Sequence, residues 1–188
     1  MSTTTPSQTV GPFFHFGLTD SYEIDDLAGK GAEGERIVVE GHVLDGEGQP
    51  VPDCMIEIWQ ANAAGKYDHP EDTQDKPVDL NFRGFGRVGT DPEGRFHFRT
   101  VKPGPVPGRG NALQAPHIVV QVYARGLLKQ LFTRIYFEGE PGNDTDPLLA
   151  MVDDADARNT LIAKNKGDGH YHWDIVLQGD NETLFFDA

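Results

Sequence analysis

Residues 117–137 read HIVVQVYARGLLKQLFTRIYF, two apolar runs separated by a short polar link at Arg125-Gly126. The runs 118–123 and 131–137 are rich in valine, isoleucine and aromatic residues, which favour extended strands. A glycine-containing link between two such runs is typical of a β-hairpin. The stretch therefore predicts two neighbouring antiparallel strands.

Further short strands are predicted before this hairpin. Residues 36–44 are rich in valine and end at the turn signal of residues 45–48. Residues 95–100 alternate phenylalanine with polar side chains, and together with 84–89 they are predicted to form a second hairpin around 90–94. Many short strands joined by turn residues indicate an all-β protein with a β-sandwich.

The remaining segments frame this predicted sandwich. Residues 1–35 are predicted to be an N-terminal arm and acidic loop, with an extended arm over 1–18. Residues 62–81 are polar and predict a long loop, and 153–164 is the only stretch that predicts a helix of any length. No linker or internal repeat divides the chain, so we expect a single domain over residues 1–188.

Composition excludes several classes of function. The chain has 30 acidic and 16 basic residues, and its net charge of −14 argues against binding to nucleic acid or to an anionic membrane. No run of about 18 apolar residues predicts a transmembrane helix, and the N-terminus does not resemble a signal peptide. Cys54 is the only cysteine, so no internal disulfide is possible. These features favour a cytoplasmic protein.

Several motifs along the chain carry a resemblance to a known family. They are TPSQTVGPF at 5–13, IWQAN at 58–62, GKY at 65–67, TVKPG at 100–104, APH at 115–117, YARG at 123–126 and TRIYF at 133–137. In this order they resemble the intradiol ring-cleaving dioxygenases, from Thr5 nearly to the last residue. The resemblance implies a β-sandwich that takes part in opening a dihydroxylated aromatic ring with O2.

The resemblance also implies where a ferric ion would bind. Iron-bearing chains of the family use two tyrosines and two histidines, and by motif Tyr67 and His117 match the first of each. Val106 and Val119 stand at the other two positions, and valine has no donor atom. Gln114 stands where the iron-bearing chains place an arginine near the substrate. We therefore expect no metal ligand in this chain, with Tyr67 and His117 as hydrogen-bonded remnants.

A chain that keeps this scaffold but lacks the ligands implies a partner. The resemblance implies a beta chain that holds Fe(III), assembled with this chain in repeated αβ units that act on a small aromatic acid and O2. It implies that Arg125 reaches the substrate pocket, where its guanidinium suits a carboxylate. It implies that Thr9, Gly11 and Pro12 in the arm pack across the partner and line the mouth of that pocket. No catalytic residue is expected in this chain itself.

The arm is also expected to be anchored by burial of Phe13 and Phe14. Arg134 and Tyr136 alternate with Thr133 on their strand and are interpreted as structural or interface residues.

Two other functions stay open. The chain could be a self-sufficient intradiol dioxygenase with unusual ligands, or a non-catalytic β-sandwich binding module. His170 and His172, with Asp174 next on the same strand face, have the spacing of a metal chelate. That face lies opposite the apolar side chains of Tyr171 and Trp173, so a solvated strand face is the preferred interpretation. Cys54 lies on a predicted apolar face, which favours burial over nucleophilic chemistry.

Overall fold

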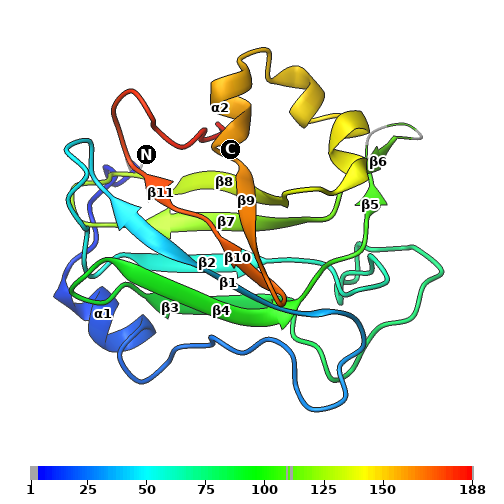
Figure 1. The fold of residues 1–188 in the computed structure, drawn as a ribbon. Coiled ribbons are helices and arrows are strands. Elements are labelled where there is room, and N and C mark those ends of the chain that lie inside the picture. Colours follow the sequence, from blue (N-terminus) through cyan, green and yellow to red (C-terminus); the bar gives the residue numbers. More distant parts are fainter. Residues whose placement is uncertain (1–3, 109, 111, 188) are drawn as a thin grey trace.

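The structure is a computed structural model that describes residues 4–108, 110 and 112–187. Figure 1 shows a strand-rich fold with short, peripheral helices, which confirms the predicted all-β class. The strands are β1 (Arg36–Leu44), β2 (Met55–Trp59), β3 (Phe85–Gly89), β4 (Arg95–Val101), β5 (Val106–Pro107), β6 (Leu113–Gln114), β7 (His117–Tyr123), β8 (Leu131–Phe137), β9 (Ile162–Gly167), β10 (His170–His172) and β11 (Ile175–Val176).

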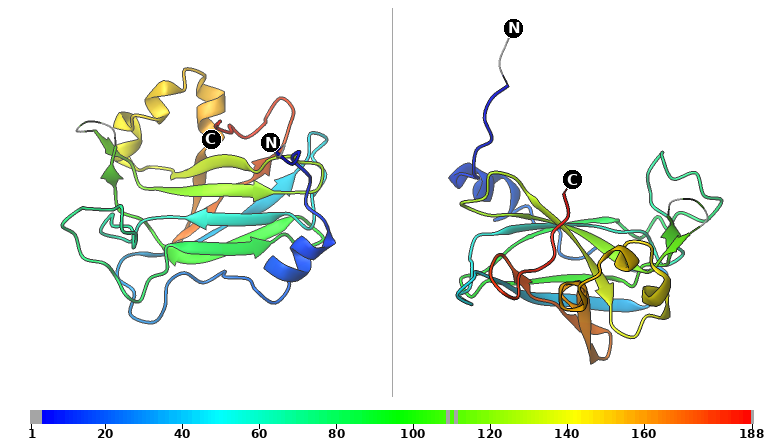
Figure 2. Two further views of the ribbon diagram at one scale, coloured as in Figure 1. Left: turned by 180° about the vertical axis from the view of Figure 1, so that it is seen from behind. Right: turned by 90° about the horizontal axis from the view of Figure 1, so that it is seen from above.

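One large sheet forms both layers of the sandwich. Its strand order is β11-β1-β10-β9-β8-β7-β2-β3, and β4 pairs with β1; β5 and β6 form a separate small sheet. Figure 1 shows β1 and β4 in front of β2 and β3, and the view from above in Figure 2 shows the two layers. The chain passes between the layers at β9 and β10, which pair antiparallel.

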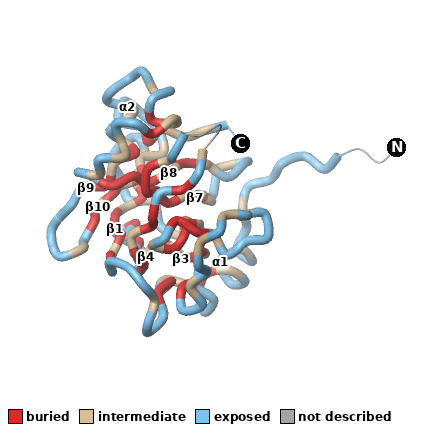
Figure 3. Tube along the Cα trace, turned by 90° about the vertical axis from the view of Figure 1, so that its right-hand side faces the viewer, coloured by how far each residue is buried: buried red, intermediate tan, exposed pale blue. Residues whose placement is uncertain are grey.

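The core lies between the two layers. Val39 and Phe98 enter it from β1 and β4, and Ile58 and Val120 enter it from β2 and β7; each is at most 2% exposed. From Arg95 to Thr100 in β4 the burial alternates, as expected for a strand with one face on the core and one in solvent, and Val101 at the end of the strand is also buried. Figure 3 shows these buried segments at the centre and exposed loops around them. Burial of each such side chain stabilises the fold by about 1.5–3 kcal/mol.

One predicted hairpin is confirmed and the other is wrong. Strands β7 and β8 pair antiparallel, with Val120 opposite Thr133. The segments 85–89 and 95–101 are strands, but β3 pairs with β2 and β4 pairs with β1. The turn between β3 and β4 therefore carries the chain from one layer to the other. Alternating polarity shows which face of a strand is buried, but it does not show which strand lies beside it.

The N-terminal arm contains a helix that the sequence analysis did not predict. Helix α1 (Pro12–Leu18) interrupts the predicted extended arm, and Pro12 occupies its first turn, where the fixed backbone angle of proline favours a helix start. Residues 1–3 of the arm lie outside the described residues. The acidic loop that follows is held to the sheet by isolated pairs such as Ile24 with Arg87.

The helix predicted over 153–164 is much shorter in the structure. Helix α2 (Ala155–Asn159) is capped by the Asp154 carboxylate, and β9 begins at Ile162, which pairs with Tyr136. Pairing with β8 therefore overrides the local preference of these residues for a helix.

Two 3-10 turns, η1 (Pro141–Thr145) and η2 (Leu149–Met151), precede α2. Across the described residues, every helix is too short or too polar to span a bilayer.

Candidate functional site

A cavity of about 560 Å3 opens at the end of the sheet where β7 begins. Its walls include Tyr67 from the loop after β2, Val106 from β5, Gln114 from β6, and His117 and Val119 from β7. The structure thus brings together all four positions that match the iron ligands of the family, together with position 114.

His117 is held as a neutral imidazole in this cavity. Its side chain is buried, and Nδ1 lies 2.7 Å from the carbonyl oxygen of Ala115. Burial, followed by the nearby charge of Arg134, lowers the pKa of His117 to about 4. We therefore assign the ring proton to Nδ1, where it is donated to Ala115, which leaves Nε2 as an acceptor. The predicted hydrogen bond is present for this residue.

Tyr67 is positioned by stacking and by its backbone. Its ring stacks on Trp59, with centroids 5.9 Å apart and planes 13° apart, and its backbone N–H donates to Asp72 Oδ2 at 2.8 Å. Among the described residues its phenol group has no hydrogen-bond partner, and the hydrogen bond of Tyr67 is made by its backbone. Burial raises the pKa of this phenol, although the charge of Arg134 opposes the rise. Tyr67 is therefore a protonated phenol at neutral pH.

The residues in this cavity do not fit a ferric ion. Only Tyr67 and His117 offer donor atoms at the four matched positions, and Val106 and Val119 present methyl groups instead. Ferric iron prefers anionic oxygen and imidazole ligands, and the two donors at these four positions cannot complete its coordination. Within the described part of the chain, no group of three His, Cys, Asp or Glu ligand atoms converges at this cavity.

Arg134 is a residue of this cavity that the sequence analysis did not assign to it. It lies directly opposite Val119 in the β7–β8 ladder. Its Nη1 donates to Gln114 Oε1 at 2.7 Å, and its Nε is buried without a hydrogen-bond partner among the described residues. The cavity therefore contains a guanidinium although position 114 is a glutamine. The signal was available only from the register of the hairpin, which places residue 134 across from residue 119.

A buried ion pair holds the loop that carries Tyr67. Lys66 Nζ lies 3.2 Å from Asp72 Oδ1 and also donates to the carbonyl oxygens of Asp72 and Gln74. Burial alone would raise the pKa of Asp72, but hydrogen bonds from the backbone of Tyr67 and Gln74 and from Lys66 lower that pKa to about 2. Asp72 is therefore an anion across the ordinary pH range, and it fixes one wall of the cavity.

The arm and Arg125 meet at the opposite end of β7. Gly126 N–H donates to Thr9 Oγ1 at 2.8 Å, and Thr9 Oγ1 donates to the carbonyl oxygen of Ala124 at 3.5 Å. Arg125, between these contacts, is 69% exposed, and its Nε lies 4.0 Å from Asp53. Arg125 lies eight residue steps beyond His117 along extended chain, about 26 Å at the usual strand rise. Arg125 therefore cannot reach the cavity of its own chain.

The rest of the arm lies on the surface. Gly11 and Pro12 are exposed at the start of α1. Phe13 is 88% exposed, so the expectation that it is buried is wrong for this chain by itself. Phe14 packs against Tyr123, with ring centroids 5.7 Å apart.

A family model described as Dioxygenase matches residues 11–179. The chain belongs to the intradiol ring-cleaving dioxygenase family. It is 42% identical to the protocatechuate 3,4-dioxygenase alpha chain of Burkholderia cepacia, over 98% of this chain and 97% of that one. It is 40% identical to the alpha chain of Pseudomonas putida, over 97% and 96% of the two chains. The beta chain from Burkholderia cepacia is 44% identical over 80% of this chain and 67% of its own length.

Solved structures agree with this assignment of the fold. The dioxygenase domain of a carbohydrate-binding fusion protein from Streptomyces sp. SirexAA-E aligns with a TM-score of 0.62 and 26% identity, over 93% of this chain and 99% of that one. Catechol 1,2-dioxygenase from Acinetobacter sp. ADP1 aligns with a TM-score of 0.63 and 22% identity, over 87% and 60%, which supports the fold alone.

Two features that the sequence raised as possible reactive or metal-binding groups, Cys54 and the strand around His172, lie away from this cavity. Cys54 is 1% exposed, and burial raises the pKa of its thiol to about 12, which confirms the predicted buried cysteine. Tyr171 and Trp173 are buried as predicted, and His170 is exposed. His172, however, contacts Asp174.

Proposed function

We propose that this chain is the non-iron-binding alpha subunit of a protocatechuate 3,4-dioxygenase. The observation that carries the proposal is the cavity of Tyr67, Val106, His117 and Val119, in which the dioxygenase scaffold is intact but half of the ligand positions are valine. The near full-length similarity to two alpha chains supports the same conclusion. Under this proposal a beta chain holds ferric iron, and the two chains assemble as repeated αβ units.

The proposed reaction opens the ring of 3,4-dihydroxybenzoate between its two hydroxylated carbons. Both atoms of O2 enter the product, 3-carboxy-cis,cis-muconate. The iron of the partner chain supplies the activation of the diol toward O2. The residues of this chain bind and orient the substrate and exclude water from the shared pocket.

The placement of Arg125 and the arm supports a pocket shared between chains. Thr9 is hydrogen-bonded on both sides of Arg125, so the arm and the arginine present one surface. That surface faces away from the chain's own cavity, and it leaves Phe13 exposed beside Gly11 and Pro12. In this proposal Arg125 binds the substrate carboxylate, and Thr9, Gly11 and Pro12 cover the mouth of the partner's pocket.

Co-expression with the beta chain tests the assembly. We expect the two chains to co-purify, iron to be present with the complex, and this chain alone to bind no stoichiometric ferric iron. A tyrosinate-to-iron absorption band from this chain alone would instead indicate a self-sufficient dioxygenase. A well-behaved monomer that ignores the beta chain would indicate a binding module.

The variant Arg125→Ala tests the substrate role in the complex. A charge-assisted hydrogen bond contributes about 1.5–3 kcal/mol, and the exposure of Arg125 places the effect at the low end. We expect about a tenfold loss in kcat/KM for 3,4-dihydroxybenzoate, mainly through KM. Catechol, which has no carboxylate, should lose much less, and iron content should not change.

Lys129→Ala is the matched control, because Lys129 is an exposed cation in the same β7–β8 connection. It should leave both substrates unaffected. Equal losses for both substrates in Arg125→Ala would show that the residue supports the interface and does not bind the carboxylate.

A further inference from the structure

A group of metal-ligating side chains lies on the outer face of the sheet, where His42, His172 and Asp174 converge. Each offers one ligand atom, and these atoms all lie within 4.8 Å of one another. His42 Nδ1 is 3.2 Å from Asp174 Oδ1, and His172 Nε2 is 3.1 Å from Asp174 Oδ2. The side chains are 31–40% exposed, so an ion can enter from solvent.

Parallel strand pairing brings these residues together. Glu40 in β1 is opposite His172 in β10, and Val43 in β1 is opposite Ile175 in β11. His42 and His172 therefore project from the same outer face of neighbouring strands, with their ring centroids 6.1 Å apart.

A close approach of the two backbones completes the group. A Cβ at Gly41 would lie 1.8 Å from the carbonyl oxygen of Trp173, so only glycine fits at position 41. The backbone N–H of His42 donates to Asp174 Oδ1 at 2.8 Å. In regular strand pairing the acceptor would be a backbone carbonyl oxygen. The carboxylate is thus fixed by the backbone of the strand that carries one of the two imidazoles.

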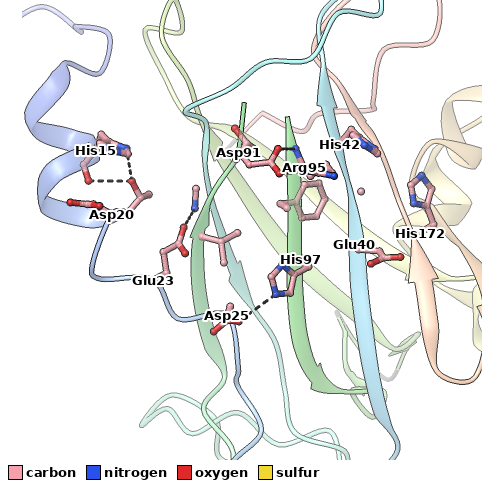
Figure 4. A pocket seen from close by; sticks show the side chains of 16 residues that line it. His15, Asp20, Glu23, Asp25, Glu40, His42, Asp91, Arg95, His97 and His172 are labelled. Carbon is pink, nitrogen blue, oxygen red and sulfur yellow. Dashed lines mark hydrogen bonds and ion pairs between the residues drawn. The ribbon is translucent and has the colours of Figure 1, made fainter. Parts of the chain in front are cut away.

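The surroundings favour a cation. His42 and His172 line a groove of about 560 Å3 between the sheet and α1, and Figure 4 shows them on neighbouring strands at one side of it. Five carboxylates line the same groove: Asp20, Glu23, Asp25, Glu40 and Asp91. The arginine of the groove, Arg95, is already paired with Asp91 at 2.7 Å.

We propose that His42, His172 and Asp174 bind one divalent transition-metal ion such as Zn2+. Two imidazoles and a carboxylate suit zinc, copper or nickel, and they leave open positions for water. Ligands about 2.0–2.1 Å from a tetrahedral zinc lie about 3.3–3.4 Å apart, and the three ligand atoms here lie within 4.8 Å of one another, with the two imidazoles on different oxygens of the Asp174 carboxylate. On binding, the ion replaces the two hydrogen atoms between imidazole and carboxylate, and each imidazole carries its proton on the other ring nitrogen.

The site goes beyond the proposed ring-cleavage function, because it uses no residue of the cavity, the arm or Arg125. A bound ion would join β1 to the segment between β10 and β11. These strands lie next to the point where the chain passes between the two layers of the sandwich. Because the three ligands come together only in the folded chain, a bound ion would stabilise the fold.

Equilibrium dialysis of the untagged, EDTA-treated full chain against Zn2+ tests the site. We expect one equivalent for the parent chain, with affinity at least about tenfold weaker in His172→Ala and in Asp174→Asn. Asp174→Asn keeps an oxygen acceptor for the His42 backbone, so it separates loss of the metal from loss of the fold. The melting temperature should rise with added Zn2+ in the parent chain and not in either variant.

His170→Ala is the matched control, because His170 is an exposed histidine on the same strand that does not belong to the cluster. It should bind Zn2+ like the parent chain. The proposal would be overturned by absence of binding at submillimolar Zn2+, by parent-like affinity in both His172→Ala and Asp174→Asn, or by equal loss in His170→Ala.

Discussion

Replacing Asp72 with alanine should destabilise the loop that holds Tyr67 at the cavity. Asp72 and Lys66 form a buried pair, with side chains 7% and 9% exposed. Removing the carboxylate leaves the ammonium of Lys66 buried without its counter-ion, a change that costs about 3–5 kcal/mol. Lys66 Nζ keeps its hydrogen bonds to the carbonyl oxygens of residues 72 and 74, so we expect the loss in the free energy of unfolding to lie at the low end of this range, about 3 kcal/mol.

Thermal unfolding followed by circular dichroism measures this effect. For a chain of this size each kcal/mol corresponds to about 2–4 °C, so the melting temperature of Asp72→Ala should fall by about 6–12 °C. Asp75→Ala is the matched control, because Asp75 is exposed in the same loop and forms no ion pair among the described residues. The double variant Lys66→Met with Asp72→Ala should regain part of the loss, because no buried charge remains unpaired.

The pH dependence gives a second measurement on the same residue. The pKa of Asp72 is about 2 in the folded protein, below its ordinary value of 3.8. A lowered carboxyl pKa stabilises the fold above the ordinary pKa, and this stabilisation is lost as the pH falls toward the folded pKa. The difference between the parent chain and Asp72→Ala should therefore shrink between pH 4 and pH 2. Equal melting temperatures for Asp72→Ala and Asp75→Ala at pH 7 would refute the reasoning.

Three further predictions follow from other contacts. The pKa of His117 is lowered to about 4 in the folded chain, so His117 binds a proton more readily in the unfolded chain. Acidification from pH 6.5 to 4 should therefore lower the free energy of unfolding of the parent chain, measured by urea titration, by up to about 3 kcal/mol more than that of His117→Gln. Cys54, with its pKa raised to about 12, should resist iodoacetamide at pH 8 in the folded chain and react fully in denaturant, as read by mass spectrometry; labelling of the folded chain would contradict this. Thr9→Val removes the hydrogen-bond acceptor for Gly126 N–H. A hydrogen bond that contributes about 1 kcal/mol slows exchange about fivefold, so hydrogen exchange at the Gly126 amide should be about fivefold faster in the variant. An unchanged exchange rate would show that the arm does not hold the turn.

Local sequence patterns predicted strands β1, β3, β4, β7 and β8. The alternation in 95–100 predicted which face of that strand is buried, because successive side chains point to opposite faces of a strand. The loss of donor atoms at Val106 and Val119 is a property of residue type, so no structure was needed to expect it. Proline at position 12 is a recognisable helix-start signal that the sequence analysis did not use.

The tertiary structure alone decided which segments lie beside one another. It separated β3 from β4 into different layers, and it ended the helix near residue 159 so that Ile162 could pair with Tyr136. It also placed Arg134 across from Val119 and brought His42 to Asp174, 132 residues away. A repeating pattern of apolar residues indicates which face of a strand is buried, whereas the strand that pairs with it depends on how the whole core packs. For that reason the sequence predicted the faces of the strands, and only the fold brought the charged side chains together.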